Sequence, residues 1–298
     1  MNIDLYKDCT LCPRRCHTDR TENKFGVCAM GDKPYVALAD LHFWEEPCIS
    51  GISGSGAVFF SGCNLSCVYC QNKDISHMKC GYEVDLERLC EIYFELKEKG
   101  AENINLVTAT HFLPHIISSV KRAKENGINL PFVYNTSGYE TEESIERLSE
   151  VIDIFLPDFK YFRAEDSKRY SHCSDYPEVA FKAIKKMVEK KGRCVFDGDK
   201  IKKGVIIRHL LLPGKLIASK MAIKLLYEEF GESVYYSLMS QYTPNGCLEN
   251  YPEIDRSVFE YEYRSLVRYC EGLGIKNAYI QDLSSAKESF IPSFNSQV

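Results

Sequence analysis

The sequence predicts an α/β protein whose mainly parallel sheet forms a partial or complete (β/α) barrel. Short apolar runs rich in Val, Ile, Phe and Tyr alternate with amphipathic stretches along most of its 298 residues. Such runs are typical of strands that are covered on both faces, and their alternation with helices favours a parallel sheet. Roughly six βα units suit a barrel, although a doubly wound open sheet remains compatible with the pattern alone.

Seven apolar runs are the expected strands. They are residues 57–60, 104–109, 132–135, 152–156, 204–211, 234–239 and 278–281. Asp85 and Thr141 can cap two of the intervening helices. Asp255 precedes a third expected helix, which carries Phe259, Tyr263, Leu266, Val267 and Cys270 on one side. We therefore divide the chain into a cysteine-rich segment at 1–56, a barrel at 57–283 and a C-terminal tail at 284–298.

Composition narrows the class of function. The chain has 37 basic and 42 acidic residues mixed along its length, a net charge of −5, and no basic stripe of the kind found in nucleic-acid-binding proteins. No apolar run approaches the ~20 residues that a membrane span requires, and the first residues lack a signal-peptide core. We expect a cytoplasmic protein with neither a nucleic-acid nor a membrane partner.

Fourteen cysteines in a cytosolic chain indicate metal binding rather than disulfides. One tight group is Cys63, Cys67 and Cys70, with the spacing C-x3-C-x2-C. Three thiolates can hold three irons of a [4Fe–4S] cube and leave the fourth iron free, whereas a ferredoxin normally uses four thiolates. A structural zinc loop is the alternative interpretation, but such sites are usually closed by four ligands.

A second group, Cys9, Cys12, Cys16 and Cys28, lies in an N-terminal segment with little periodicity. This segment has too little apolar surface to order itself, so we expect it to fold around a metal. A closed zinc site and a second iron–sulfur cluster both fit these ligands, and His17 can replace one cysteine. Four free thiols in a loose arm are the remaining alternative.

Polar side chains follow the expected strands where each strand ends, which is where function lies in parallel barrels and open sheets alike. In chain order they are Cys63, Thr108, Thr110, His111, Asn135, Ser137, Asp158, Lys160, Arg208, His209 and Gln241. Asp158 and Lys160 lie two apart on a strand and so share a face, where they can bind a ligand or form a structural ion pair. Arg208 and His209 should point to opposite faces.

Residues 54–65, with the cysteines that follow, resemble the radical S-adenosylmethionine (SAM) superfamily. The chain more narrowly resembles the pyruvate formate-lyase activating enzyme-like branch, a largely unassigned group with an N-terminal cysteine-rich leader. Residues 9–16, 105–111, 133–139, 156–160, 207–214 and 237–244 carry this resemblance. It implies a partial (β/α)6-type barrel that binds a [4Fe–4S] cluster and SAM.

The resemblance also implies individual roles. Cys63, Cys67 and Cys70 would hold the cluster at which SAM is cleaved. The side chains expected to bind SAM are Thr108, Thr110, Ser137, Asp158, Lys160, Arg208 and either Gln241 or Tyr242. Superfamily members commonly carry Gly-Gly-Glu-Pro after the second strand, whereas residues 108–114 read Thr-Ala-Thr-His-Phe-Leu-Pro. This segment offers hydroxyl groups and carbonyls, but no carboxylate, to the ammonium group of SAM.

The implied reaction is reductive cleavage of SAM to a 5′-deoxyadenosyl radical. That radical would abstract hydrogen from a protein, as in the activation of glycyl-radical enzymes, or from a small molecule. An oxidoreductase of this kind requires a low-potential electron donor of the flavodoxin or ferredoxin type. The alternative is an iron–sulfur- or zinc-binding scaffold or redox sensor that cleaves nothing, which the absence of Gly-Gly-Glu-Pro supports.

Overall fold

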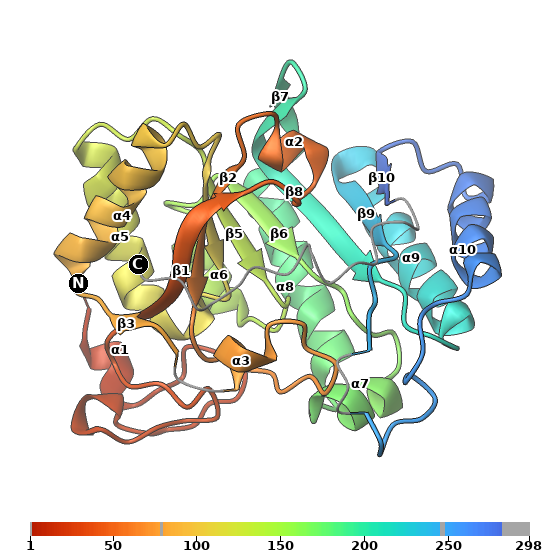
Figure 1. Ribbon diagram of the computed structural model, residues 1–298, viewed down its shortest axis with the longest axis horizontal. Coiled ribbons are helices and arrows are strands. Elements are labelled where there is room, and N and C mark those ends of the chain that lie inside the picture. The colour runs from red at the N-terminus through yellow and green to blue at the C-terminus, as the bar shows by residue number, and fades with distance from the viewer. Residues whose placement is uncertain (1, 78–79, 245–247, 282–298) are drawn as a thin grey trace.

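The computed structural model describes residues 2–77, 80–244 and 248–281. Its strands form one curved, mostly parallel sheet in the order β10-β9-β8-β6-β5-β4-β2-β1-β3, with β7 paired to β8. Helices line the convex side of this sheet, so the described part of the chain is a partial barrel (Figure 1). The tail expected at 284–298 lies outside the described residues.

Seven strands run parallel to one another, and each coincides with one of the expected apolar runs. They are β2 (Ser55–Phe60), β4 (Ile104–Val107), β5 (Phe132–Thr136), β6 (Ile154–Pro157), β8 (Lys200–Leu210), β9 (Tyr235–Met239) and β10 (Ala278–Ile280). Every residue of β2, β4, β5 and β6 is buried, as expected for strands covered on both faces. The prediction of an α/β partial barrel is confirmed.

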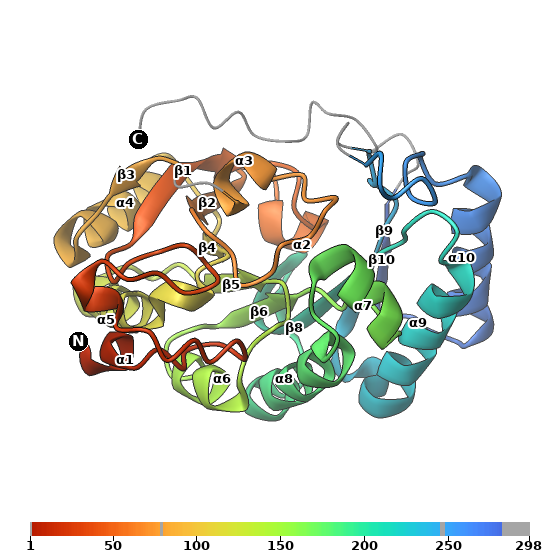
Figure 2. The same cartoon turned by 90° about the horizontal axis from the view of Figure 1, so that it is seen from below.

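Helices of an outer layer connect these strands. They are α4 (Leu86–Glu98), α5 (Leu113–Glu125), α6 (Glu142–Leu148), α8 (Tyr176–Lys191), α9 (Leu216–Phe230) and α10 (Glu260–Gly272). Seen from below, with the molecule turned by 90° from the view of Figure 1, they form an outer layer around the sheet (Figure 2). None of the helices in the described ranges is long and apolar enough to cross a membrane.

Two of the predicted helix caps are confirmed. The side chain of Asp85 accepts a hydrogen bond from the Arg88 amide, and the side chain of Thr141 accepts one from the Ser144 amide. The helix expected after Asp255 is α10, which has Phe259 at its N-cap and buries Tyr263, Leu266 and Cys270. The first turn of α10 is instead stabilised by its own Glu262, whose carboxylate accepts a hydrogen bond from the Phe259 amide at 2.9 Å.

Three antiparallel strands were not expected: β1 (Tyr35–His42), β3 (Tyr82–Glu83) and β7 (Val195–Asp197). Strand β1 pairs with β2 from Val36 to His42, so the N-terminal segment contributes directly to the sheet. The short helix α2 (Pro47–Ser50) lies in the connection between β1 and β2. Its Cys48 and Ile49 pack against Val133, Ile154 and other residues inside the barrel.

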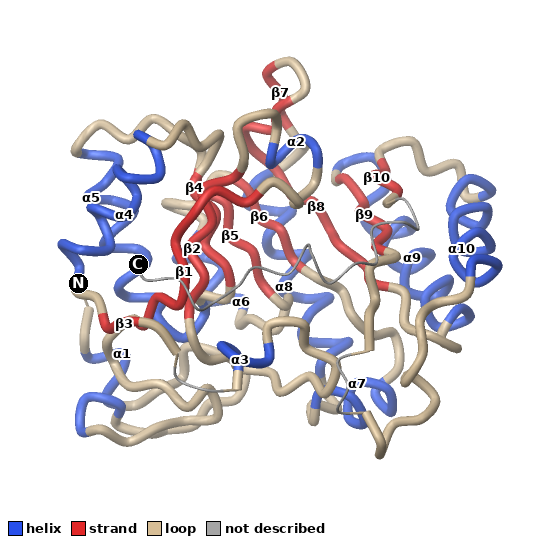
Figure 3. Tube along the Cα trace, in the orientation of Figure 1, coloured by secondary structure: helices blue, strands red, loops and turns tan. Residues whose placement is uncertain are grey.

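The two ends of the barrel are therefore different. Helix α2 and strand β7 lie at the end where the parallel strands begin (Figure 1). Loops gather at the end where these strands finish, together with α3 (Lys73–Ser76), α7 (Ala164–Ser171) and the segment that contains α1 (Asp4–Lys7), as Figure 3 shows. The 3-10 turns Arg20–Glu22 and Thr110–Phe112 belong to this end, and Gly231–Ser233 follows α9. One end is plugged by apolar side chains, and the other carries the candidate site.

Candidate active site

A cavity of about 230 Å³ lies inside the carboxyl end of the barrel. The cysteine loop after β2 forms one wall, and residues from the ends of β4, β5, β6, β8 and β9 form the others. The predicted site residues that line it are Cys63, Cys67, Cys70, Thr108, Ser137, Asp158, Lys160, Arg208 and Gln241. Segments spread over nearly 180 residues of sequence thus meet at one place.

Each thiol of the cysteine loop accepts a hydrogen bond. Cys63 Sγ accepts from the Leu65 amide at 3.4 Å, Cys67 Sγ from the Ser171 hydroxyl at 2.9 Å, and Cys70 Sγ from the Ser76 hydroxyl at 3.3 Å. Burial and the neighbouring Cys67 raise the pKa values of Cys63 and Cys70 as free thiols, whereas the Lys160 ammonium opposes this shift. Hydrogen-bond donors and a nearby cation suit thiolates, the form that binds iron.

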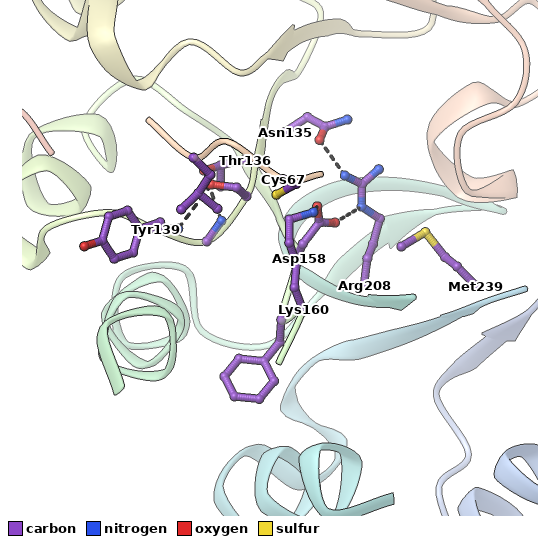
Figure 4. A network of polar contacts seen from close by, with 12 residues as sticks. Cys67, Asn135, Thr136, Tyr139, Asp158, Lys160, Arg208 and Met239 are labelled. Carbon is purple, nitrogen blue, oxygen red and sulfur yellow. Dashed lines mark hydrogen bonds and ion pairs between the residues drawn. The ribbon is translucent and has the colours of Figure 1, made fainter. Parts of the chain in front are cut away.

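Asp158 stands between two cations. Its Oδ2 lies 2.5 Å from Lys160 Nζ and its Oδ1 lies 2.8 Å from Arg208 Nε (Figure 4). Burial alone would raise the pKa of Asp158, but Arg208 and Lys160 outweigh burial and hold that pKa below its usual value. The ion pair considered from the sequence therefore exists, and it faces the cavity.

Arg208 extends this network to the floor of the cavity. Its NH2 donates to Asn135 Oδ1 at 2.6 Å, and its NH1 lies 3.2 Å from Glu45 Oε2. Glu45 Oε1 accepts hydrogen bonds from Asn135 and Asn105 at 3.0 and 3.2 Å. Glu45 is thus fully paired, and it is an acid that the sequence analysis did not include in the site.

Some candidates lie elsewhere. Thr110 does not line the cavity, because its hydroxyl donates to buried Glu140 Oε1 at 2.6 Å. Tyr242 is likewise turned away and donates to the carbonyl of Ile254 at 2.7 Å, which leaves Gln241 at the cavity. His209 points away from Arg208, as expected, and its ring contacts the carbonyl of Phe159.

The residues that sequence reasoning missed come mainly from the connection between β1 and β2. They are His42, Trp44, Glu45 and Glu46, all of which line the cavity. The run from Tyr35 to His42 resembles a strand in composition, and two adjacent glutamates precede a proline. Those two signals, taken together, would have indicated that acids lie at the end of a strand.

The N-terminal cysteines lie close to one another. Cys9, Cys12 and Cys28 are buried and Cys16 is partly buried. The charge of Cys9 raises the pKa values of both Cys12 and Cys28, although burial is the larger cause in each case. By number and chemistry, four thiols are the donor set that a zinc ion or an iron–sulfur cluster uses.

Arg20 is buried beside this group, with 1% of its surface exposed. It donates hydrogen bonds to the carbonyls of Met30, Gly31 and His111, and its NH1 lies 3.7 Å from Cys9 Sγ. It forms no ion pair with a carboxylate within the described residues. A buried cation of this kind requires a nearby negative charge, which metal-bound thiolates would supply.

Within the described ranges, no three His, Cys, Asp or Glu side chains converge closely enough to hold a single metal ion. A [4Fe–4S] cube distributes its thiolates over separate irons, so its ligands are farther apart than those of a single ion. The shared cavity and the sulfur-directed donors of the loop from Cys63 to Cys70 fit that wider arrangement.

The fold and this site define a protein of the radical SAM class. The sequence profile of the radical SAM superfamily matches residues 57–216, which is more than half of the chain. The protein therefore belongs to the radical SAM superfamily, which implies an enzyme that binds a [4Fe–4S] cluster and SAM. An uncharacterized protein from Methanocaldococcus jannaschii is 27% identical over 284 residues, which cover 93% of this chain and 78% of that protein.

Solved structures share the fold at low sequence identity. A radical SAM methyltransferase from Sphaerobacter thermophilus has a TM-score of 0.54 and 14% identity, covering 76% of this chain and 66% of that one. SuiB from Streptococcus suis, bound to its precursor peptide SuiA, has a TM-score of 0.52 and 12% identity, and the match covers 75% of this chain and 48% of SuiB. This chain thus spans about half the length of SuiB, and the likeness concerns the fold alone.

Proposed function

We propose that Cys63, Cys67 and Cys70 hold a [4Fe–4S] cluster and that the protein uses it to cleave SAM reductively. The observation that carries this proposal is the single cavity shared by the three thiols and the polar residues at successive strand ends. When bound, the cluster would supply the electron that converts SAM to methionine and a 5′-deoxyadenosyl radical, which removes hydrogen from a substrate.

The protein itself would bind and orient SAM and exclude water. Ser137, Lys160 and Gln241 present polar atoms to the cavity and would contact SAM. Arg208 already binds Asp158, Asn135 and Glu45, so its role would be to hold Asp158 in place. Hydroxyl and carbonyl groups at Thr108 would receive the ammonium group of SAM, in place of the missing carboxylate.

The direct test is anaerobic. The protein is reconstituted with iron and sulfide, reduced, mixed with SAM and assayed for 5′-deoxyadenosine by chromatography. We expect product from the wild type and none from Cys67→Ala. Cys90→Ala is the matched control, because Cys90 lies on α4, outside the cavity, and should leave turnover unchanged. Undiminished product from Cys67→Ala would overturn the proposal.

The scaffold or redox-sensor alternative predicts a different result. A protein that carries clusters but cleaves nothing would hold iron and bind no SAM. Calorimetry with SAM distinguishes the two, and Lys160→Met should weaken SAM binding at least tenfold if Lys160 contacts SAM, which is about 1.4 kcal/mol. Unchanged affinity of that variant for SAM would show that Lys160 does not contact SAM.

The substrate defines two versions of the proposal. An activating-enzyme-like oxidoreductase predicts a glycine-centred radical on a partner protein, which electron paramagnetic resonance detects. A small-molecule enzyme predicts turnover without any macromolecule. Both versions need a low-potential donor, for which a flavodoxin or ferredoxin in the cytoplasm is our proposal.

A second candidate function is metal binding by Cys9, Cys12, Cys16 and Cys28, and the observation that favours it is the buried cation Arg20. Elemental analysis of Cys12→Ala tests it. This variant should lose one zinc ion or one cluster, and it should keep the iron of the cluster proposed at Cys63, Cys67 and Cys70. Identical metal content in variant and wild type would contradict it. The ratio of iron to zinc decides which metal is bound.

A further inference from the structure

We propose that the floor of the cavity is a separate subsite that binds the cationic nitrogen of a small organic substrate. This inference rests on the proposed function, because it assigns the substrate class of that same cavity. Its centre is Glu46, in the connection between β1 and β2, with Trp44 at the rim.

Glu46 is the buried acid of the cavity that lacks a cation. It is 7% exposed, it lines the cavity, and its Oε2 has no hydrogen-bond partner. It also forms no ion pair within the described part of the chain, whereas the adjacent Glu45 uses both carboxylate oxygens. A buried carboxylate with one oxygen unpaired and no ion pair costs free energy, and a cationic ligand would offset that cost.

The charges of the cavity do not balance. Three acids line it, Glu45, Glu46 and Asp158, but only two permanent cations, Lys160 and Arg208. Arg208 binds Glu45 and Asp158, and Lys160 binds Asp158, so both cations are committed to the other two acids. Burial raises the pKa of Glu46 to about 7, although Arg208 opposes the shift. A cation that enters the cavity would pair the remaining acid and favour its charged form.

The rim of the cavity suits an organic cation rather than an inorganic one. Trp44 is the single tryptophan of the chain, lines the cavity and remains 57% exposed. The face of an indole ring attracts ammonium and guanidinium groups. His42 also lines this side, and burial followed by the charge of Arg208 lowers its pKa, so it stays neutral there. An exposed aromatic ring and a buried carboxylate that line one cavity are a combination that suits aliphatic amines and guanidines.

This subsite is distinct from the place proposed for the SAM ammonium group. The Arg208 guanidinium and the Ser237 hydroxyl both act on the pKa of Glu46, which places Glu46 beside β8 and β9. Thr108 follows β4, on the other side of β5 and β6 in the sheet. In addition, Ser237 lies two residues before the cavity-lining Met239 on β9, so Glu46 lies deeper in the barrel than Met239 and Gln241.

Calorimetry on the reconstituted, SAM-loaded protein provides the test, with agmatine as the cationic probe. Butyrate and n-butanol are the anionic and neutral controls of similar length. We expect agmatine to bind the wild type and to bind at least tenfold more weakly to Glu46→Gln, while both controls fail to bind. Glu125→Gln is the matched variant, because Glu125 is exposed at the end of α5 and should change nothing.

The thermal midpoint of the protein without agmatine, at pH 8, is an independent measurement. Glu46→Gln removes an unpaired buried charge at constant size, so the midpoint should rise, whereas a purely structural role would lower it. Absent agmatine binding, equal binding to Glu46→Gln, or a lower midpoint would overturn the subsite. Weaker SAM binding in Glu46→Gln would also overturn it, by assigning Glu46 to SAM. A wild type that binds no SAM contradicts the proposed function instead, whatever agmatine does.

Discussion

Arg20 donates a hydrogen bond to the carbonyl oxygen of His111 at 2.7 Å, across 91 residues of sequence. The ring of the same histidine bonds to the carbonyl of Ser61 at 2.7 Å, two residues before Cys63. The N-terminal segment is thereby joined to the turn after β4 and to the cysteine loop at once. The N-terminal segment, the turn after β4 and the residues just before Cys63 therefore share one chain of hydrogen bonds.

Replacing Arg20 by Met should destabilise the protein by about 3 kcal/mol, because buried hydrogen bonds of a charged group contribute roughly 1.5–3 kcal/mol each. The N-terminal metal should be lost as well, since the variant removes the cation beside Cys9. Thermal unfolding and metal analysis measure the two effects. Arg15→Met, at an exposed arginine, is the control. Full metal content in Arg20→Met would mean that Arg20 is not the counter-charge of that site.

Gly62→Ala should disturb the contact between the N-terminal segment and the cysteine loop. A Cβ at Gly62 would lie 2.5 Å from Met30 Cγ and 2.6 Å from the carbonyl oxygen of Cys28, at a φ of +82°. We expect lower iron content and a loss of roughly 2–4 kcal/mol, which adds overpacking to backbone strain. Gly100→Ala isolates the strain alone, because its φ is +89° and no atom lies within 4 Å. Equal losses in the two variants would show that the packing contact is unimportant.

Ser171→Ala should lower the reduction potential of the proposed cluster. The Ser171 hydroxyl donates to Cys67 Sγ at 2.9 Å, and hydrogen bonds to cluster sulfurs favour the more negative, reduced state. Loss of about 1 kcal/mol corresponds to roughly 40 mV for one electron. Redox titration followed by electron paramagnetic resonance measures the shift. Ser167 lies on the same helix α7, but its hydroxyl donates to the Ala164 carbonyl. Ser167→Ala should therefore leave the reduction potential unchanged.

His115 predicts a pH dependence of stability. Burial lowers its pKa to about 4, so between pH 6.5 and 4 the unfolded chain binds a proton that the folded protein does not. Stability is therefore complete above pH 6.5 and falls as the pH drops towards 4. His115→Gln should remove about 2 kcal/mol of the loss between pH 7.5 and 5, measured as thermal midpoints at the two values. A variant with the wild-type pH profile would contradict this assignment.

The parallel strands were predictable because each is a short, nearly continuous apolar run between recognisable helix signals. The cysteine loop and the strand-end residues Ser137, Asp158 and Lys160 were found for a related reason. A parallel barrel always brings its strand ends together, so position along each strand predicts the side chains at the cavity.

The rest of the site depends on tertiary contacts, which the pattern of apolar and polar residues along the sequence does not predict. Strand β1 contains Asp40 and His42 among its apolar residues, so it does not alternate clearly, and its pairing with β2 fixes Glu45 and Glu46 at the cavity. Thr110 follows β4 like Thr108, but its hydroxyl donates a hydrogen bond to the buried Glu140 instead of facing the cavity. Which of these side chains faces the cavity therefore depends on contacts with residues that lie far away in sequence.

The ion pair between Glu45 and Arg208 joins residues 163 positions apart, and it links the first part of the chain to the fifth parallel strand. Closing a loop of that length carries a large entropic cost, which must be met before the contact can contribute. The β1–β2 hairpin, by comparison, is local and can form early. The charged floor of the cavity therefore exists only once β8 has joined the sheet, so a partly folded chain would lack the place where substrate is proposed to bind.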